Sequence, residues 1–110
     1  MRIVSGKFKG RTFSVPSGFP SRPTTDFAKE GLFNILNNQL DYDGIRVLDL
    51  CAGTGNISFE FISRGAELVT AVDKNRKVSS WITVNASKLG VTEQVKVFNM
   101  DCLGFLQKCT

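Results

Sequence analysis

The feature that most constrains the fold of this chain is an alternation of short apolar segments, glycine turns and helical segments that begins at Ile45. The apolar segments at 45–50, 68–72 and 94–98 have the length of buried strands. Segments with helical spacing follow them at 56–63, 75–89 and 102–107. Such an alternation is typical of a parallel sheet covered by helices. We therefore predict an α/β fold with three parallel strands.

The residues before this alternation begin with a basic arm. Residues 2–15 alternate polar and apolar side chains, interrupted by Gly6 and Gly10, which predicts a hairpin or a meander. A loop rich in proline and glycine follows and separates the arm from the rest of the chain. We therefore predict an arm and loop over residues 1–23 and one ligand-binding domain over residues 24–110.

One helix is predicted between the arm and the first strand. Thr24, Thr25 or Asp26 would cap its N-terminus, and the turn at 41–44 would follow its end. Its apolar side chains recur at helical spacing, so we expect them to face the core. They are Phe27, Ala28, Leu32, Ile35 and Leu36.

The arm also carries all of the excess positive charge. The chain has a net charge of +4, and residues 26–110 hold nine basic and ten acidic side chains. The arm contains no acidic residue, and its basic residues are Arg2, Lys7, Lys9, Arg11 and Arg22. Phe8, Phe13 and Phe19 lie among them, and basic and aromatic side chains together suit a nucleic-acid backbone and unstacked bases. The alternative is a solvated edge hairpin, since charged side chains also protect edge strands.

Other residue types exclude several classes of function. The chain has no histidine, and its three cysteines, at 51, 102 and 109, do not have the spacing of a metal site. We therefore expect no metal, no Ser-His-Asp triad and no histidine acid-base chemistry. No apolar run is long enough to cross a bilayer, and the first ten residues are too polar for a signal peptide, so we expect a cytoplasmic protein.

The segment most informative about function connects the first strand to the next helix. It reads Asp49-Leu50-Cys51-Ala52-Gly53-Thr54-Gly55. Glycines at such a turn let the backbone approach a ligand closely, and the free N–H groups of the following helix face the same space. Tight packing alone would also explain the glycines. Asp49 favours a ligand other than a dinucleotide, because a carboxylate beside these glycines would repel a pyrophosphate.

Each of the three predicted strands is followed by an aspartate. Asp49, Asp73 and Asp101 would lie at the carboxyl edge of the sheet, where open α/β sheets bind ligands. S-Adenosylmethionine (SAM) carries a sulfonium and an ammonium but no phosphate, so carboxylates would attract it. Asp73 could accept hydrogen bonds from the ribose hydroxyls, and Asp101 one from the adenine amino group. For each aspartate alone, the alternatives are a helix N-cap or a surface charge.

The residues 49–55 resemble motif I of class I SAM-dependent methyltransferases, with Asp73 and Asp101 at the second and third cofactor motifs. The arm at 1–11, the segment Arg22-Pro23-Thr24-Thr25-Asp26 and the residues 29–34 are similar to the start of bacterial small-subunit (16S) ribosomal RNA guanine-N2 methyltransferases. The resemblance covers essentially the whole chain. It implies the first three strands of a Rossmann-like sheet and transfer of a methyl group to the exocyclic N2 of a guanine.

The resemblance also implies two groups of site residues. The cofactor-binding set comprises Arg22, Thr24, Asp49, Cys51, Ala52, Gly53, Thr54, Gly55, Asp73, Lys74, Asp101 and Cys102. Arg22 and Thr24 enter because the corresponding segment folds over the cofactor pocket in the family. The RNA-binding set comprises Arg2, Lys7, Lys9, Arg11 and Arg22, with 16S ribosomal RNA or a small-subunit assembly intermediate as the partner.

The family holds the target amine with an Asn/Asp-Pro-Pro-aromatic element, and this sequence has none. We therefore name no catalytic residue and expect the chain to correspond to the N-terminal half of such an enzyme, inactive by itself. The first strand would then be an edge, which predicts self-association or aggregation. A non-catalytic SAM- or RNA-binding fragment is the alternative function. An NAD-dependent oxidoreductase is a further one, disfavoured by Asp49 and by the lack of a third glycine in 55–58.

Overall fold

A computed structural model of the chain describes residues 1–22 and 24–109. Its elements are α1 (Asp26–Leu36), β1 (Arg46–Asp49), α2 (Asn56–Ser63), β2 (Leu68–Asp73), α3 (Arg76–Leu89), a short 3-10 helix (Thr92–Gln94), β3 (Val95–Asn99) and α4 (Cys102–Lys108). The predicted alternation of strands and helices from residue 45 onward is confirmed, with boundaries within about two residues. The reason is that the apolar runs and the caps at Thr25, Asn75 and Gly90 are local signals.

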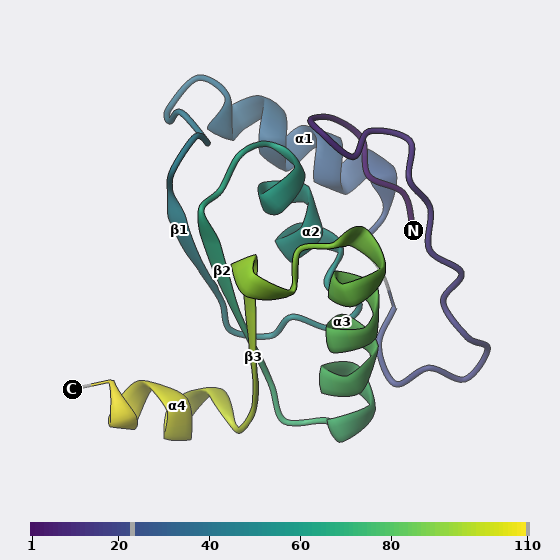
Figure 1. The fold of residues 1–110 in the computed structure, drawn as a ribbon, viewed down its shortest axis with the longest axis vertical. Coiled ribbons are helices and arrows are strands. Elements are labelled where there is room, and N and C mark those ends of the chain that lie inside the picture. Colours follow the sequence, from purple (N-terminus) through teal and green to yellow (C-terminus); the bar gives the residue numbers. More distant parts are fainter. Residues whose placement is uncertain (23, 110) are drawn as a thin grey trace.

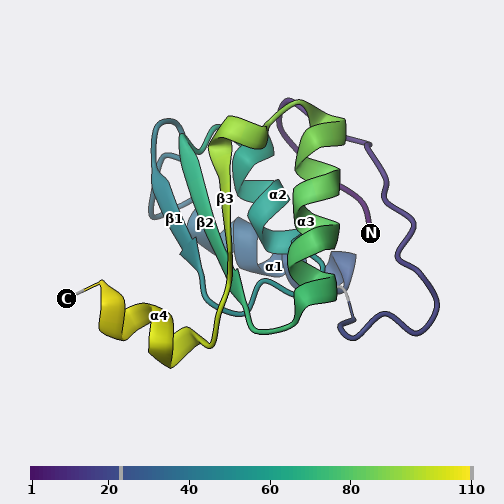
Figure 2. The same ribbon diagram turned by 60° about the horizontal axis from the view of Figure 1, so that its bottom comes forward.

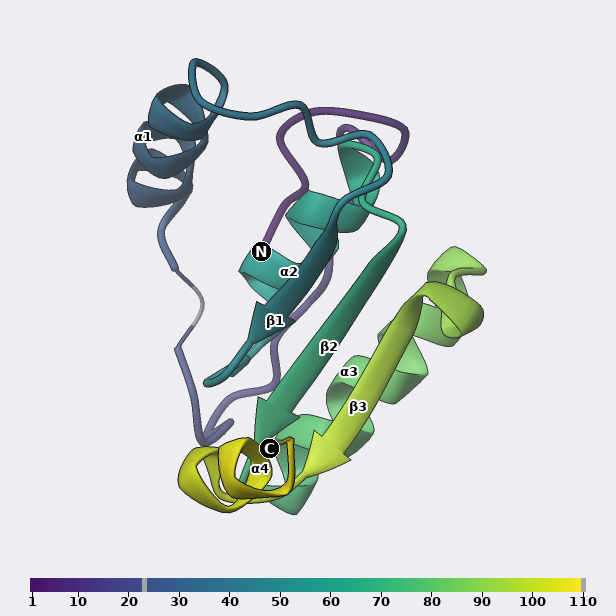
Figure 3. The same cartoon turned by 90° about the vertical axis from the view of Figure 1, so that its left-hand side faces the viewer.

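The three strands form one parallel sheet in the order β1-β2-β3 (Figure 3). All of them point toward the same end of the molecule, where α4 begins. Helices α1, α2 and α3 lie on one side of this sheet (Figures 1 and 2). β1 is therefore an edge strand within the described residues, as predicted.

The core lies between the sheet and the two helices α2 and α3. Val69 and Ala71 of β2 point into it, and Phe59 of α2 and Ile82 of α3 are fully buried against them. The opposite face of the sheet is less covered, because Leu48 of β1 is 45% exposed. Leu48 therefore exposes apolar surface on this face of the edge strand.

The N-terminal arm forms an antiparallel pair, but a very short one. Its only bridge among the described residues joins Arg2 and Thr12. The backbone N–H of Ile3 donates to the carbonyl of Arg11 over 2.9 Å. The predicted hairpin is confirmed in its direction, but it contains no regular strand. The division at residue 23 stays a prediction, although Ile3 packs in the same core as Phe59.

Helix α1 presents a different face to the core from the one that its sequence predicts. Phe27 is 87% exposed and Ile35 is 60% exposed, whereas Lys29 and Phe33 are fully buried. Phe33 packs edge-on against Phe61 of α2, with the ring centroids 4.8 Å apart. The predicted stripe at 27, 28, 32, 35 and 36 is therefore wrong as the core-facing side: the side that faces the core holds Phe33, and Lys29 in an ion pair with Glu60.

Candidate cofactor-binding site

The turn between β1 and α2 depends on its two glycines. Gly53 and Gly55 have φ angles of +54° and +78°, which L side chains rarely adopt. A Cβ atom on Gly55 would lie 2.9 Å from the ring of Phe59, so a side chain there would clash with the core. Trp81 of α3 fixes the same turn, since its Nε1 donates to the carbonyl of Thr54 over 2.9 Å. Trp81 is itself partly buried against the core.

Asp49 lies beside this turn at the end of β1. Its Oδ2 accepts a hydrogen bond of 2.6 Å from Oγ of Ser58, which lies in the first turn of α2. Burial raises the pKa of the Asp49 carboxyl above its ordinary value, although the bond from Ser58 opposes this effect. The side chain lines a hollow of about 90 Å³ between the glycine turn and the residues Arg22 and Thr24.

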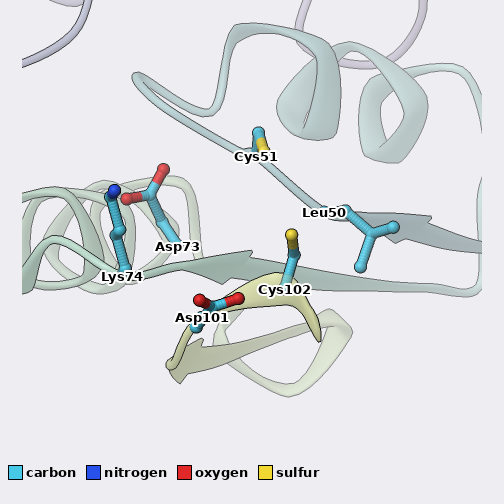
Figure 4. A pocket seen from close by; sticks show the side chains of 6 residues that line it. All are labelled: Leu50, Cys51, Asp73, Lys74, Asp101 and Cys102. Carbon is cyan, nitrogen blue, oxygen red and sulfur yellow. The ribbon is translucent and has the colours of Figure 1, made fainter. Parts of the chain in front are cut away.

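A second cavity, of about 220 Å³, lies at the carboxyl ends of the strands. Figure 4 shows the side chains around it, which come from the end of β1, the end of β2 and the start of α4. They belong to Leu50, Cys51, Asp73, Lys74, Asp101 and Cys102. The cavity lies where the strand order predicts a ligand.

The two carboxylates in this cavity also bond to nearby backbone. Oδ2 of Asp73 accepts from the N–H of Gly53 over 3.2 Å, which ties β2 to the glycine turn. Its Oδ1 accepts from the N–H of Asn75 over 2.9 Å. Asp101 caps α4 by accepting from the N–H of Leu103 over 2.8 Å. The N-cap alternative is therefore true of Asp101, which lines the cavity as well.

The three predicted aspartates do not share one cavity. Asp73 and Asp101 line the larger one, Asp49 lines the smaller one, and Cys51 lines both. The two hollows are thus neighbours on either side of Cys51. Eleven of the predicted cofactor residues line one or both: Arg22, Thr24, Asp49, Cys51, Ala52, Gly53 and Thr54 the smaller, and Cys51, Asp73, Lys74, Asp101 and Cys102 the larger. Gly55 lines neither and shapes the turn.

The predicted RNA-binding side chains all lie at the surface. Arg2, Lys7, Lys9, Arg11 and Arg22 are exposed. Arg2 has an ion pair with Asp26, at 3.5 Å, and Lys7 lies 5.5 Å from the ring centre of Phe8. Arg11 lines a surface hollow of about 290 Å³ together with Lys88 of α3.

Of the three aromatic side chains of the arm, Phe13 is not available as a stacking surface for bases, and Phe8 and Phe19 are partly buried. Phe13 is buried and stacks on Phe59, with the ring centroids 5.5 Å apart. Phe19 packs against Trp81, and Phe8 packs against the core. The physical reason is that burying an aromatic ring stabilises the folded chain, whereas a ring left exposed to solvent does not.

The sequence pattern missed a group of buried polar residues behind the glycine turn. Lys29 and Glu60 form an ion pair of 3.0 Å, and both side chains are 0% exposed. Asn56, the first residue of α2, bonds both to Lys29 and to the carbonyl of Thr24. Two sequence features could have indicated this pair: Lys29 lies among the apolar residues of its helix, and Glu60 lies in a helix that is mostly apolar.

The comparisons with known proteins agree with this geometry. A family profile described as "Conserved hypothetical protein 95" matches residues 1–110. The chain belongs to this family. The sequence is 39% identical over 101 residues to the "Putative rRNA methyltransferase YlbH" of Bacillus subtilis, which covers 92% of this chain and 54% of that protein. It is 34% identical to "Ribosomal RNA small subunit methyltransferase D" of Escherichia coli K12, over 96% of this chain and 52% of that protein. The chain thus spans about half the length of these relatives.

Solved structures give the same fold. A "Putative methyltransferase yhhF from Escherichia coli" superimposes with a TM-score of 0.82 at 31% identity, over 96% of this chain and 55% of that one. A SAM-dependent methyltransferase from Thiobacillus denitrificans, solved with S-adenosyl-L-homocysteine, superimposes with a TM-score of 0.62 at 27% identity, over 77% of this chain and 33% of that one. The predicted α/β fold, the Rossmann-like half-sheet of class I methyltransferases, is confirmed.

Two further findings concern the described residues only. No helix over 1–22 and 24–109 has both the length and the apolar content to span a bilayer. Within the same residues, no three side chains of His, Cys, Asp or Glu converge on a possible metal site.

Proposed function

We propose that this chain binds SAM and forms the cofactor-binding half of a methyltransferase that modifies the exocyclic N2 of a guanine in 16S ribosomal RNA. The observation that supports the proposal is the pair of neighbouring hollows that share Cys51: Asp49 lines the smaller one, and Asp73 and Asp101 line the larger one. The relatives named as rRNA methyltransferases support the substrate. Ribosomal RNA as the substrate would place the protein in the cytoplasm.

The chain's own residues would bind and orient the cofactor. When bound, SAM would supply a methyl group that its sulfonium already activates for transfer to an amine. Asp49 would place negative charge near the cationic end of the cofactor, and the Asp73 carboxylate would accept hydrogen bonds from the ribose hydroxyls. Catalysis in such a site depends on orientation, because the methyl group is already activated. We assign no catalytic residue within this chain.

Calorimetry tests the cofactor. S-Adenosylhomocysteine should bind the chain, whereas NAD should not, since Asp49 opposes a pyrophosphate. Asp73→Asn should weaken S-adenosylhomocysteine binding about tenfold or more, as expected for hydrogen bonds to a charged group. Asp43→Asn, at an exposed position outside both hollows, is the matched control. Binding of NAD in preference to S-adenosylhomocysteine would contradict the proposal.

We also infer that Arg2, Lys7, Lys9, Arg11 and Arg22 contact RNA phosphates. Replacing Lys7, Lys9 and Arg11 by Glu should weaken binding to 16S ribosomal RNA and reduce its dependence on salt, because fewer counterions are released. Cofactor affinity should stay unchanged in this variant. Equal RNA affinity for variant and wild type would instead support the solvated-edge alternative.

Methyl transfer to small-subunit RNA distinguishes an enzyme from a non-catalytic binding fragment. The chain contains no Asn/Asp-Pro-Pro-aromatic element, so we expect it to bind the cofactor without transferring a methyl group. Transfer of a labelled methyl group to purified 16S RNA by the chain alone would contradict this expectation.

We also propose that copies of the chain associate through the free edge of β1.

A further inference from the structure

The segment that covers the smaller hollow is attached to the rest of the molecule through Asn56. Arg22 and Thr24 form one wall of that hollow, and the glycine turn forms the other. The Nδ2 of Asn56 donates to the carbonyl of Thr24 over 2.7 Å. Asn56 also lines the hollow and is itself buried. One side chain thus joins the two walls.

The orientation of the Asn56 amide is determined by a buried lysine. The Nζ of Lys29 donates to Oδ1 of Asn56 over 2.8 Å, which leaves Nδ2 directed at Thr24. Lys29 also donates to the carbonyl of Arg2. An ammonium group can only donate, so the amide cannot turn over without losing both bonds.

Glu60 holds Lys29 in this position. Its Oε1 lies 3.0 Å from Nζ of Lys29, and its Oε2 accepts from Nε of Arg64 over 2.9 Å. The backbone N–H groups of Val4 and Ser5 donate to the same carboxylate over 2.9 and 3.1 Å. No buried side-chain polar atom among the described residues lacks a partner. The network therefore runs without a gap from the arm to the carbonyl of Thr24.

We propose that Asn56 is a positioning residue that holds the segment at Arg22 and Thr24 over the glycine turn, with Lys29 and Glu60 fixing its amide. This inference rests on the proposed function, since it assigns the segment a role in retaining the cofactor. It explains why a lysine and a glutamate are buried behind the turn without contacting either hollow.

The test is Asn56→Asp. The aspartate keeps the size of the side chain and its acceptor for Lys29, but it cannot donate to the carbonyl of Thr24. We expect S-adenosylhomocysteine to bind about tenfold more weakly, mainly through faster dissociation. The backbone amides within residues 21–22 and 24–28 should exchange with deuterium faster in the unliganded variant. Asn85→Asp is the matched control, because Asn85 is a buried helical asparagine that donates to the carbonyl of Trp81 over 2.8 Å, outside both hollows.

The outcomes separate this inference from the proposed function. Unchanged exchange at 21–22 and 24–28 in Asn56→Asp would overturn the positioning role, whether or not the cofactor binds. Faster exchange with unchanged S-adenosylhomocysteine affinity would overturn the link between the segment and the cofactor. Failure of the wild-type chain to bind S-adenosylhomocysteine would overturn the proposed function and this link, whereas exchange in the unliganded chain still decides whether Asn56 holds the segment. An equal effect of Asn85→Asp on amide exchange in this segment and on S-adenosylhomocysteine affinity would overturn the specific role of Asn56.

Discussion

At the scale of single residues, the site contains one carboxyl group, that of Asp49, whose charge is costly to bury. Burial raises the pKa of the Asp49 carboxyl above its ordinary value. Ionisable groups with shifted pKa values are concentrated at functional sites. Among the described residues, the hydroxyl of Ser58 is the side-chain partner of Asp49, and no ion pair balances its charge there.

Asp49→Asn should stabilise the chain and weaken cofactor binding. When folding raises the pKa of a carboxyl group, the folded chain loses stability as the pH rises through that raised pKa. An amide carries no charge at pH 7, so Asp49→Asn should remove this loss. Asn can still accept the bond from Ser58. We expect a higher Tm at pH 7 and affinity for S-adenosylhomocysteine about 10- to 100-fold weaker. A lower Tm for Asp49→Asn at pH 7 would contradict the burial argument.

Glu60 should give the opposite dependence on pH. Burial raises the pKa of Glu60, but bonds from Val4 and Arg64, and the bond and charge of Lys29, together bring it below its ordinary value of 4.5. A carboxyl with a lowered pKa contributes stability above its unfolded pKa, and this contribution is lost as the pH falls through the folded one. The Tm of the chain should therefore fall as the pH decreases below about 4.5.

Glu60→Gln measures this contribution. It leaves the buried ammonium of Lys29 without a counterion, which we expect to cost about 3–5 kcal/mol of unfolding free energy at pH 7. The remaining dependence of Tm on acidic pH should be weaker than in the wild type. Glu67→Gln is the control, because its ion pair with Arg46 is exposed and contributes at most about 1 kcal/mol. Equal losses for the two variants would contradict the argument.

At the scale of elements, the arm packs on the end of α2 through its backbone. The N–H of Lys7 donates to the carbonyl of Ser63 over 2.7 Å, and Oγ of Ser63 donates to the carbonyl of Ser5 over 2.6 Å. Gly6 lies between these two contacts. The arm is therefore a part of the packed structure, while its basic side chains lie at the surface.

Gly6→Ala should destabilise the chain far more than Gly10→Ala. Both glycines have positive φ, of +90° and +88°, so the backbone strain of about 1–2 kcal/mol is the same. A Cβ on Gly6 would lie 2.0 Å from the carbonyl oxygen of Ser63, whereas one on Gly10 meets nothing within 4 Å. Urea denaturation should show a loss several kcal/mol larger for Gly6→Ala. Similar midpoints would mean that the arm is not attached there.

At the scale of the whole molecule, the sheet has an open edge and an open face. β1 has no partner on one side within the described residues, and Leu48 is 45% exposed. Leu103 of α4 and Phe27 of α1 add exposed apolar surface. Unpaired strand edges with apolar side chains promote association between chains.

The chain should therefore associate as its concentration rises, and Leu48→Lys should reduce this association. A lysine on an edge strand opposes pairing with a second strand. Val84→Lys is the control, because Val84 is also half exposed, at 51%, but lies on α3 and not on the sheet. Sedimentation velocity over a range of concentrations measures the effect. A monomer at every concentration, or equal effects of both variants, would contradict this prediction.

The sequence by itself determined the order of the elements and the place of the glycine turn. These features depend on local signals: apolar runs, the caps at Thr25 and Asn75, and glycines that alone adopt positive φ. The location of the aspartates at the carboxyl edge of the sheet was also predictable, because parallel strands all end at that edge.

Only the tertiary structure decided which side of α1 is buried and what lies behind the site. The ion pair of Lys29 and Glu60 joins residues far apart in the chain, and helical spacing alone predicted the apolar stripe through Phe27 to be buried instead. The separation of Asp49 from Asp73 and Asp101 into neighbouring hollows also depends on how the turn at Cys51 packs. A pattern of residue types records which side chains tend to be buried, whereas the partner that makes burial of a charge favourable is set by three-dimensional packing.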